Sequence, residues 1–378
     1  MSQKKRVVVG MSGGVDSSVA AYVLLKQGYD VMGLFMRNWD STLNKDVLGN
    51  PEIAQPLCSQ EQDYQDAKAV CDHLGIPLER VDFIEEYWNH VFSYFLEEYQ
   101  KGRTPNPDIL CNKFIKFDAF FKHAQAFNPD YIAMGHYARL SHDTPKRLLR
   151  GIDDNKDQTY FLSQLSSAQL TQVLFPVGEY TKAEVRRLAL DAGLPTAKKK
   201  DSTGICFIGE RDFNQFLNNY LPAKPGRMET LDGEDMGAHT GLMHYTIGQR
   251  KGLGIGGSAE HGTDPWFVLG KDLERNVLKV GQGYHHPKLY GTHAFASDVN
   301  VIEPTQTFIR QTCTAKFRHR QKDVKVHVEP TETGIKITFL EKVRAVTPGQ
   351  AVVFYQEEVC LGGAFIDAVY QGEEQLHI

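Results

Sequence analysis

Apolar runs and stretches of helical period alternate along the first part of the chain. Short apolar runs at 7–9, 31–36, 80–84 and 131–134 predict strands. Between them, apolar residues recur at helical spacing in 19–25, 64–74, 87–99 and 114–127. This alternation predicts an α/β domain with a doubly wound parallel sheet, in which ligands bind at the carboxyl ends of the strands.

The hydrophobic period changes in the second part of the chain. A capping box at Thr181 and Glu184 opens a helix that runs to about residue 192 and stops at Gly193. Short strand-like pieces follow at 242–247, 266–269 and 277–280, and alternating runs at 312–317, 324–328, 335–339 and 351–354. We therefore expect an α/β domain over 1–208, a small central β-rich domain over 209–287, and a C-terminal β-barrel or sandwich over 288–378.

Composition and charge exclude several classes of protein. The chain has 378 residues, of which 41% are hydrophobic and 24% charged, as in globular proteins of two or three domains. No apolar run is long enough to cross a bilayer, and residues 1–6 lead directly into a strand, so we expect a cytoplasmic protein without membrane contact. The net charge of −5 excludes a general polyanion binder, although 42 Lys and Arg residues allow local basic patches.

The six cysteines form no C-x-x-C pair. This spacing argues against a zinc ribbon and against a thioredoxin-type motif. In a cytoplasmic chain the thiols are mostly reduced, so any functionally important cysteine acts by its reactivity.

The first predicted strand leads into a glycine-rich turn, with the sequence V-V-V-G-M-S-G-G-V-D-S-S over residues 7–18. Glycines let backbone N–H groups close on phosphate oxygens, and the positive end of the following helix favours the same anion. No lysine follows, which excludes the loop that handles a transferred γ-phosphate. The turn instead resembles the pyrophosphatase-type loop (PP-loop) of enzymes that split ATP between its α and β phosphates; a plain strand-to-helix turn is the alternative. The predicted nucleotide site comprises Gly10, Met11, Ser12, Gly13, Gly14, Val15, Asp16 and Ser17.

Met36 and Gly135 lie at the predicted carboxyl ends of two further strands. Both therefore fall on the edge where the nucleotide site is expected, although core packing and a simple turn are their alternative roles. The polar stretch 38–59 predicts a long loop, and such loops inside compact domains usually serve function.

Cys111 is the first candidate for a reactive thiol. Pro105 and Pro107 precede a predicted helix start near Asp108, which places Asp108 and Cys111 on one helix face and Cys111 in the first turn. There the helix dipole lowers the pKa of a thiol, and Asp108 could accept or donate a proton. The alternative is that Asp108 is a plain cap and that Cys111 is a small buried apolar residue.

Cys206 is the second candidate. It lies between Gly204 and Gly209, downstream of three lysines at 198–200, and so occupies a cationic segment in which a reactive thiol is expected. A strand cysteine behind a solvated lysine run is the alternative.

Several long motifs occur in a fixed order. They are S-G-G-V-D-S-S, G-R-T-P-N-P-D-I-L-C-N, G-H-Y at 135–137, N-K-D-Q-T-Y-F-L from Asn155, A-K-K-K-D-S-T-G-I-C-F-I-G-E from Ala197, G-Q-R-K-G-L-G-I-G-G from Gly248, T-P-G-Q from Thr347 and V-C-L-G-G from Val359. Together they resemble the bacterial tRNA-specific 2-thiouridylases, the tRNA-uridine 2-sulfurtransferases. The resemblance spans residues 9–363, and the chain diverges in the 40–58 loop and in the C-terminal strands.

This resemblance implies a PP-loop domain, a small central domain and a C-terminal β-barrel that binds tRNA. It implies ATP-dependent 2-thiolation of the wobble uridine with Mg²⁺, and a persulfide-donating partner that is a cysteine desulfurase or a sulfur-relay protein. Gly10 to Ser17 with Met36 and Gly135 would hold ATP; Cys111 would be the nucleophile and Cys206 the persulfide carrier. Target-base contacts would come from Asn106, Pro107 and Asp108, and further tRNA contacts from His136, Lys156, Asp157, Gln158, Arg318, His319 and Gln350.

A basic cluster at 318–322 stands out in an otherwise acidic C-terminal region. It is either a contact for the tRNA backbone or a solvated edge strand protected by its charges. Two other classes of function also remain open: a PP-loop amidotransferase or ligase, which would need neither Cys111 nor Cys206, and an ATP-gated RNA-binding module, which would consume no ATP.

Overall fold

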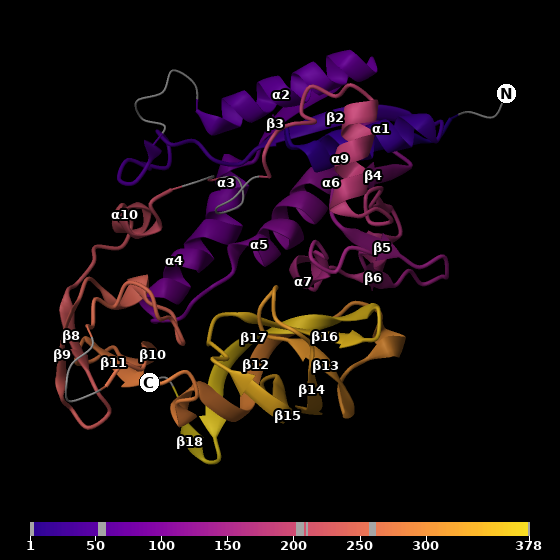
Figure 1. Ribbon diagram of the computed structural model, residues 1–378. Coiled ribbons are helices and arrows are strands. Elements are labelled where there is room, and N and C mark those ends of the chain that lie inside the picture. Colours follow the sequence, from indigo (N-terminus) through magenta and orange to yellow (C-terminus); the bar gives the residue numbers. More distant parts are fainter. Residues whose placement is uncertain (1–3, 52–57, 202–207, 209–210, 257–261, 377–378) are drawn as a thin grey trace.

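Three bodies make up the molecule in Figure 1, a computed structural model that describes residues 4–51, 58–201, 208, 211–256 and 262–376. The first part of the chain, coloured indigo to magenta, forms a sheet with surrounding helices. The segment after α10 (Phe213–Asn218) forms a small β body, and the orange to yellow C-terminal part forms a barrel. None of the helices in the described ranges has the length and apolar character to cross a membrane.

The first body contains a parallel sheet in the order β3-β2-β1-β4-β7. Its strands are β1 (Arg6–Met11), β2 (Asp30–Arg37), β3 (Leu78–Asp82), β4 (Tyr131–Ala133) and β7 (Val173–Leu174). Every neighbouring pair is parallel. The predicted doubly wound parallel sheet is confirmed.

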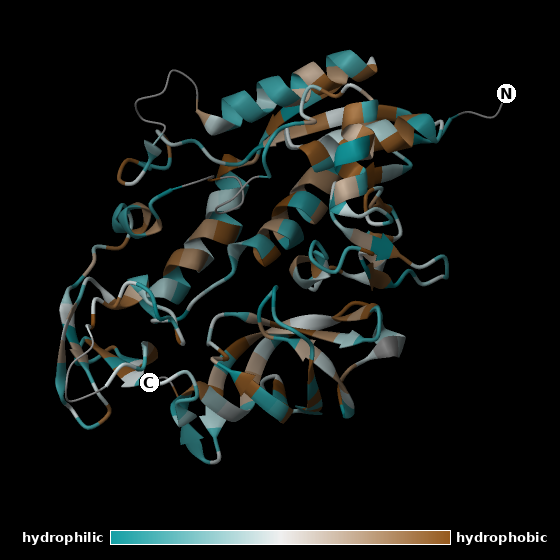
Figure 2. Ribbon diagram, viewed as in Figure 1, coloured by the Kyte–Doolittle hydropathy of each residue, from teal (hydrophilic) through white to brown (hydrophobic). Residues whose placement is uncertain are grey.

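Both faces of this sheet are covered, because side chains of each strand alternate between two cores. In β2, Val31 and Phe35 pack into one apolar cluster, while Leu34 and Met36 pack into the other. The first cluster receives α1 (Val15–Lys26), α2 (Ser59–Leu74) and α9 (Lys182–Asp191). The second receives α3 (Ile84–Tyr87), the π-helix η2 (Trp88–Phe92), α4 (Ser93–Gln100), α5 (Pro107–Leu110), the π-helix η3 (Cys111–Ala119), α6 (Phe120–Ala124) and the 3₁₀ turn η4 (Gln125–Phe127). Figure 2 shows that the outer helix α2 carries many hydrophilic residues on the side turned to solvent.

The central body is a sheet in the order β10-β11-β8-β9. Its strands are β8 (Gly226–Glu229), β9 (Asp235–His239), β10 (Trp266–Asp272) and β11 (Val277–Gln282). The strand predicted at 242–247 is wrong, because Leu242–His244 forms a 3₁₀ turn, η5. The apolar residues Leu242, Tyr245 and Ile247 are buried at irregular spacing, so a turn satisfies the pattern that suggested a strand.

The C-terminal strands close into a barrel in the order β12-β15-β14-β13-β16-β17, with β12 pairing back to β17. The strands are β12 (Tyr290–Val301), β13 (Gln311–Lys316), β14 (Val324–Pro330), β15 (Ile335–Arg344), β16 (Ala351–Gln356) and β17 (Val359–Gln371). Because this sheet closes on itself, the C-terminal part is a barrel and not a sandwich. The four strands predicted from alternating runs in this region are present. Shorter elements are η6 (Pro287–Leu289), η7 (Pro304–Gln306) and β18 (Glu374–Gln375).

A hairpin from the first part of the chain joins the barrel sheet. Strands β5 (Ala138–Leu140) and β6 (Leu148–Arg150) pair with each other, and β6 pairs with β17 through Leu148 opposite Cys360. Leu148 is fully buried at this contact. The chain then returns to the first body through α7 (Thr159–Leu162) and α8 (Ser167–Leu170). Hydrophobic patterning assigned none of this hairpin to the barrel, because strand pairing over such a sequence separation leaves no local signal.

Candidate active site

The turn between β1 and α1 is shaped by its own serines. The hydroxyls of Ser17 and Ser18 lie 3.1 Å and 2.7 Å from the Gly14 carbonyl oxygen and donate to it. Gly13 has a φ of +69°, and a Cβ atom there would lie 2.2 Å from the Asp63 carbonyl oxygen, so only glycine fits. The turn therefore has the strand, loop and helix order expected of a phosphate site.

Asp16, in the first turn of α1, is held by groups from two other segments. Lys182 Nζ lies 2.7 Å and 2.9 Å from its carboxylate oxygens, and the Tyr137 hydroxyl donates to it at 2.8 Å. Burial and the charge of Asp16 raise the pKa of Tyr137, which keeps this hydroxyl protonated. Lys182 begins α9, so a cation from a distant helix reaches the loop that has no lysine of its own.

The segment 196–201 is tied to the same loop. Lys199 Nζ donates to the Gly13 carbonyl at 3.0 Å, and Thr196 donates to Ser18 at 2.9 Å. Asp201 accepts from Lys156 at 2.7 Å and pairs with Lys182 at 2.9 Å. Although partial burial raises it, these hydrogen bonds hold the pKa of Asp201 at about 2. Of the three lysines in the predicted cationic run, Lys199 also pairs with the carboxylates of Asp63 and Asp66, at 2.7 Å and 2.5 Å.

Met36 and Gly135 lie where the sequence placed them, at the carboxyl ends of β2 and β4. Met36 is buried in the same apolar cluster as Cys111. A Cβ atom at Gly135 would lie 2.8 Å from the Ser17 backbone nitrogen, so this glycine packs directly on the phosphate loop. Both predicted residues thus border the loop edge of the sheet.

The helix that carries Cys111 begins one residue earlier than predicted. Asn106 is its N-cap and accepts from the Asp108 N–H at 3.1 Å, with Pro107 as the first helical residue. Cys111 then starts the π-helical stretch η3, so it lies just beyond the first turn rather than within it. Widened helical turns of this kind recur at functional sites.

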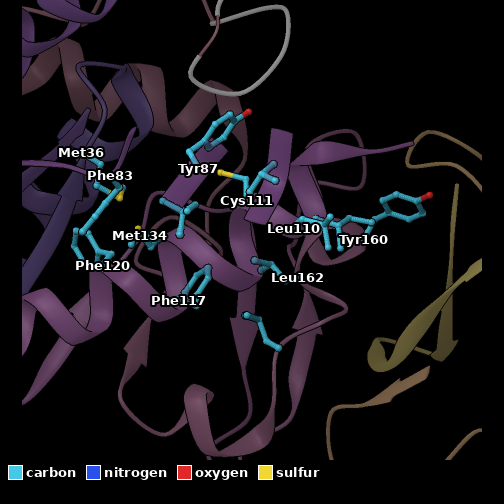
Figure 3. Packing of buried hydrophobic residues seen from close by; sticks show 14 of the residues in the cluster. Met36, Phe83, Tyr87, Leu110, Cys111, Phe117, Phe120, Met134, Tyr160 and Leu162 are labelled. Carbon is cyan, nitrogen blue, oxygen red and sulfur yellow. The ribbon is translucent and has the colours of Figure 1, made fainter. Parts of the chain in front are cut away.

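Cys111 is completely buried. Figure 3 shows its side chain beside Tyr87, on the helix that also carries Leu110 and Phe117. It belongs to the apolar cluster that also contains Met36 and Met134. The sulfur is therefore shielded from water within the apolar core of the first body. Cys206 lies outside the described residues.

Three residues that lie close in the chain to predicted site residues have buried polar atoms without a partner. Asn38 Nδ2 and Oδ1, Asn112 Oδ1 and His136 Nδ1 have no hydrogen-bond partner in the structure as described. Each such atom costs about 1–3 kcal/mol. Asn38 follows β2, Asn112 follows Cys111, and His136 follows Gly135, so all three side chains come from segments that border the predicted site. They are polar groups available to a ligand.

His136 lies between aromatic rings. Its ring centroid is 5.8 Å from that of Phe117 and 6.0 Å from that of Phe175. Burial, with the positive charge of Lys116, lowers the pKa of His136 well below its usual value, so the ring is neutral at pH 7.

Two segments predicted to bind tRNA, 156–158 and 318–319, contact each other. His319 Nε2 lies 2.8 Å from the Asp157 carbonyl oxygen, and the His319 ring packs at a tilt against Phe161, with 4.4 Å between centroids. Gln158 accepts from the Tyr137 N–H at 2.9 Å, which connects this group to the loop.

The basic cluster at 318–322 is a turn between β13 and β14, so the edge-strand alternative is wrong. Arg318 Nη2 donates to the carbonyl oxygens of Ile247 and Ala345 and to the Thr347 hydroxyl, at 2.9–3.2 Å. Gln350 Nε2 donates to the Thr104 carbonyl oxygen at 2.6 Å. Both side chains therefore join domains as well as reaching the surface.

Sequence patterns missed Lys182, Tyr137 and Lys199 as parts of the loop site. Tyr137 lies in the G-H-Y motif and Lys182 in the capping box, so each had a local signal, but neither signal shows which carboxylate the side chain reaches.

Known proteins resemble this chain over its full length. Family models match the tRNA methyl transferase HUP domain over 5–210, the tRNA methyl transferase PRC-barrel domain over 214–282 and the aminomethyltransferase beta-barrel domain over 292–366. Proteins named tRNA-specific 2-thiouridylase MnmA from Staphylococcus epidermidis and Staphylococcus aureus are each 58% identical to it, covering 100% of this chain and 99% of the relative. The chain belongs to the tRNA-specific 2-thiouridylase family.

Solved structures resemble this member of the 2-thiouridylase family only in part. A 4-thiouridine synthetase in complex with RNA and ATP aligns at a TM-score of 0.32 and 14% identity, over 55% of this chain and 46% of that one. NMN synthetase from Francisella tularensis aligns at 0.30 and 18% identity, over 52% and 66%.

Proposed function

We propose that this protein is an ATP-dependent tRNA-uridine 2-sulfurtransferase that replaces the C2 oxygen of the wobble uridine by sulfur. The observation that carries the proposal is a glycine-rich turn between β1 and α1 in the same domain as the Cys111 helix, whose buried thiol shares an apolar cluster with Met36 and Met134. Family membership and the order of the motifs support it. We place the activity in the cytoplasm, where unmodified tRNA and reduced thiols occur together.

ATP makes the uridine oxygen a leaving group. The C2 oxygen attacks the α-phosphate, pyrophosphate leaves, and the adenylated oxygen can later depart as AMP. The loop 10–17 would bind the phosphates through its backbone N–H groups, with Lys182 and Lys199 as cations in contact with it. Water exclusion around the buried Cys111 edge would protect the activated base from hydrolysis.

The loop site fits a magnesium ion that would be bound jointly by the protein and by the phosphates of the nucleotide. In the described ranges no group of three or more His, Cys, Asp or Glu side chains could hold a metal ion. Mg²⁺ in nucleotide sites needs only one or two carboxylates in addition to phosphate oxygens, and Asp16 supplies one from the loop. Bound there, Mg²⁺ would neutralise charge on the departing pyrophosphate.

Sulfur would arrive as a persulfide on Cys206, loaded by a cysteine desulfurase or a sulfur-relay protein. In one route the terminal sulfur attacks C2 and displaces AMP, and the Cys111 thiolate then attacks the Cys206 sulfur, which breaks the persulfide S–S bond and frees the thiolated base. In the other route the Cys111 thiolate attacks the Cys206 sulfur first, and the released sulfide attacks C2. In both routes AMP leaves C2 and Cys111 ends in a disulfide with Cys206, which an external thiol must reduce. Asp108, three residues before Cys111, would exchange a proton with the base or the thiol.

The base must leave its stack to reach Cys111. A single-stranded anticodon loop makes this inexpensive. Asn106, Pro107 and Asp108 at the start of the Cys111 helix would contact the flipped base, and Lys156, Asp157, His319 and Gln350 would contact the surrounding tRNA.

Nucleoside mass spectrometry on unmodified tRNA tests the proposal. The protein with ATP, Mg²⁺ and a persulfide source should produce 2-thiouridine together with AMP. AMP without sulfur incorporation would favour the nitrogen-transferring class, and tRNA binding without AMP would favour an RNA-binding module; either result would refute the sulfurtransferase.

Replacement of Arg318 and Arg320 by alanine should weaken tRNA binding and flatten its salt dependence. The logarithm of the tRNA association constant falls linearly with the logarithm of the salt concentration. Each phosphate contact that is lost makes this slope shallower by about 0.7–0.9. Because Arg318 also donates to Ile247 and Ala345, the single variant Arg320→Ala, whose side chain is exposed, separates phosphate contact from domain packing. A salt slope unchanged in both variants would show that the cluster does not touch phosphate.

A further inference from the structure

The chain immediately before the Cys111 helix is held by both C-terminal bodies. We call residues 102–104 the joint. Thr104 donates its N–H to the Pro348 carbonyl at 3.0 Å, and its hydroxyl lies 3.3 Å from that of Thr246 in the central body. Gln350 donates to the Thr104 carbonyl oxygen at 2.6 Å. Two residues before Asn106, the barrel thus holds the backbone of Thr104 and the central body holds its side chain.

The joint follows a tightly closed helix end. Gly102, with a φ of +74°, donates its N–H to the Tyr99 carbonyl, and Arg103 donates to the Glu98 carbonyl, at 3.0 Å and 2.9 Å. This is a Schellman motif, which ends α4 and turns the chain sharply. The Gly102 carbonyl points away from the helix and needs a donor from elsewhere.

Lys271 in β10 supplies that donor. Its Nζ lies 2.9 Å from the Gly102 carbonyl oxygen, and the residue is only 4% exposed. Burial lowers the pKa of Lys271 to about 7, yet both the charged and the neutral amine can donate this hydrogen bond. An apolar side chain would be less costly to bury at such a position, so the contact with the joint explains the lysine.

The backbone of β10 is irregular just before Lys271, which affects the direction of its side chain. The register of β10 against β11 shifts between Val268 and Gly270, just before Lys271. Bulges of this kind re-aim the side chains that follow. Figure 1 shows β10 in the central body close to the lower end of α4.

Resting on the proposed function, we propose that Lys271 is a positioning residue for the target uridine. By holding the Gly102 carbonyl, the central domain sets the position of the joint, and through it the position of Asn106 and Asp108 at the start of the Cys111 helix. This gives the central domain a task in the reaction: it aligns the base contacts with the phosphate loop, while the barrel holds the same joint from the other side.

The test is Lys271→Met, which keeps the length of the side chain and removes the donor. Single-turnover thiolation should fall about 10- to 100-fold, the effect of misplacing reacting groups by about 1 Å. The dissociation constants for ATP and for tRNA should stay at their wild-type values, since neither the loop nor the barrel surface is changed.

Lys279→Met is the matched control. Lys279 lies on the adjacent strand β11 and pairs with Glu229 inside the central domain at 3.0 Å, away from the joint. This variant should thiolate at the wild-type rate. Thr246→Val loosens the same joint without a buried amine and should give a smaller loss in the same direction, which keeps the test valid if Lys271→Met does not fold.

Wild-type turnover by folded Lys271→Met, or equal losses in Lys271→Met and Lys279→Met, would overturn the inference. So would a parallel loss of ATP affinity, because that reports general disruption of the fold rather than misalignment of the base. A wild-type protein that forms no 2-thiouridine would instead overturn the proposed function.

Discussion

Replacing Cys111 by serine is expected to abolish thiolation, with a loss of about 10³-fold or more. A hydroxyl is far less nucleophilic than a thiolate and cannot form the disulfide that releases sulfur. Cys111 is fully buried in an apolar cluster, and serine is nearly isosteric, so tRNA and ATP should still bind. Mass spectrometry of the product nucleosides, with filter binding of tRNA, measures both effects.

Cys206→Ser should give the same loss for a different reason, because the persulfide would have no carrier. The two variants can be separated by protein mass spectrometry after incubation with the sulfur donor: Cys111→Ser should retain a persulfide, and Cys206→Ser should not.

Cys313→Ser is the control for these variants. Cys313 lies in β13 of the barrel, where burial raises the pKa of its thiol to about 12 and leaves it inert at neutral pH. Normal 2-thiouridine formation by Cys111→Ser or by Cys206→Ser would refute the two-thiol mechanism.

Asp16→Asn should reduce tRNA-dependent AMP formation by about 10²- to 10³-fold, the size of effect seen when a group that stabilises transition-state charge is removed. The substitution keeps the size of the side chain but removes the negative charge that pairs with Lys182 and that could bind Mg²⁺. Release of radiolabelled AMP from ATP measures the effect without depending on sulfur transfer.

Lys182→Met should lower ATP affinity as well as the AMP rate, because the loop would lose one of the two cations that contact it. Asp72→Asn is the matched control for Asp16→Asn, since Asp72 pairs with Lys68 at 2.6 Å on the exposed side of α2. Full AMP formation by Asp16→Asn would mean that the loop does not handle phosphate as proposed.

Most strands of the sheet and of the barrel could be predicted because their information is local, whereas β7, β12 and β17 were not predicted. In β14, Val324, Val326 and Val328 are buried while their neighbours face outward, and this period of two is legible in the sequence alone. The glycines at 13 and 14 likewise predict a turn, since Gly13 adopts a backbone conformation that other residues avoid.

Contacts between distant segments could not be predicted in the same way. Lys182 meets Asp16 across 166 positions, and Gln350 meets Thr104 across 246, so no window of sequence contains both partners. The strand predicted at 242–247 failed for a related reason: its apolar residues are buried by packing against β10 and β11 rather than by a pleated ladder.

The hairpin of β5 and β6 connects the first part of the chain to the C-terminal barrel by strand pairing. Its partner segment at Val359 and Cys360 has β16 on one side and β6 on the other. A barrel expressed from residue 288 onward would leave that side of β17 open to pair with another copy, and so invite aggregation. The barrel therefore keeps this side of β17 covered only when residues 138–150 are part of the same protein.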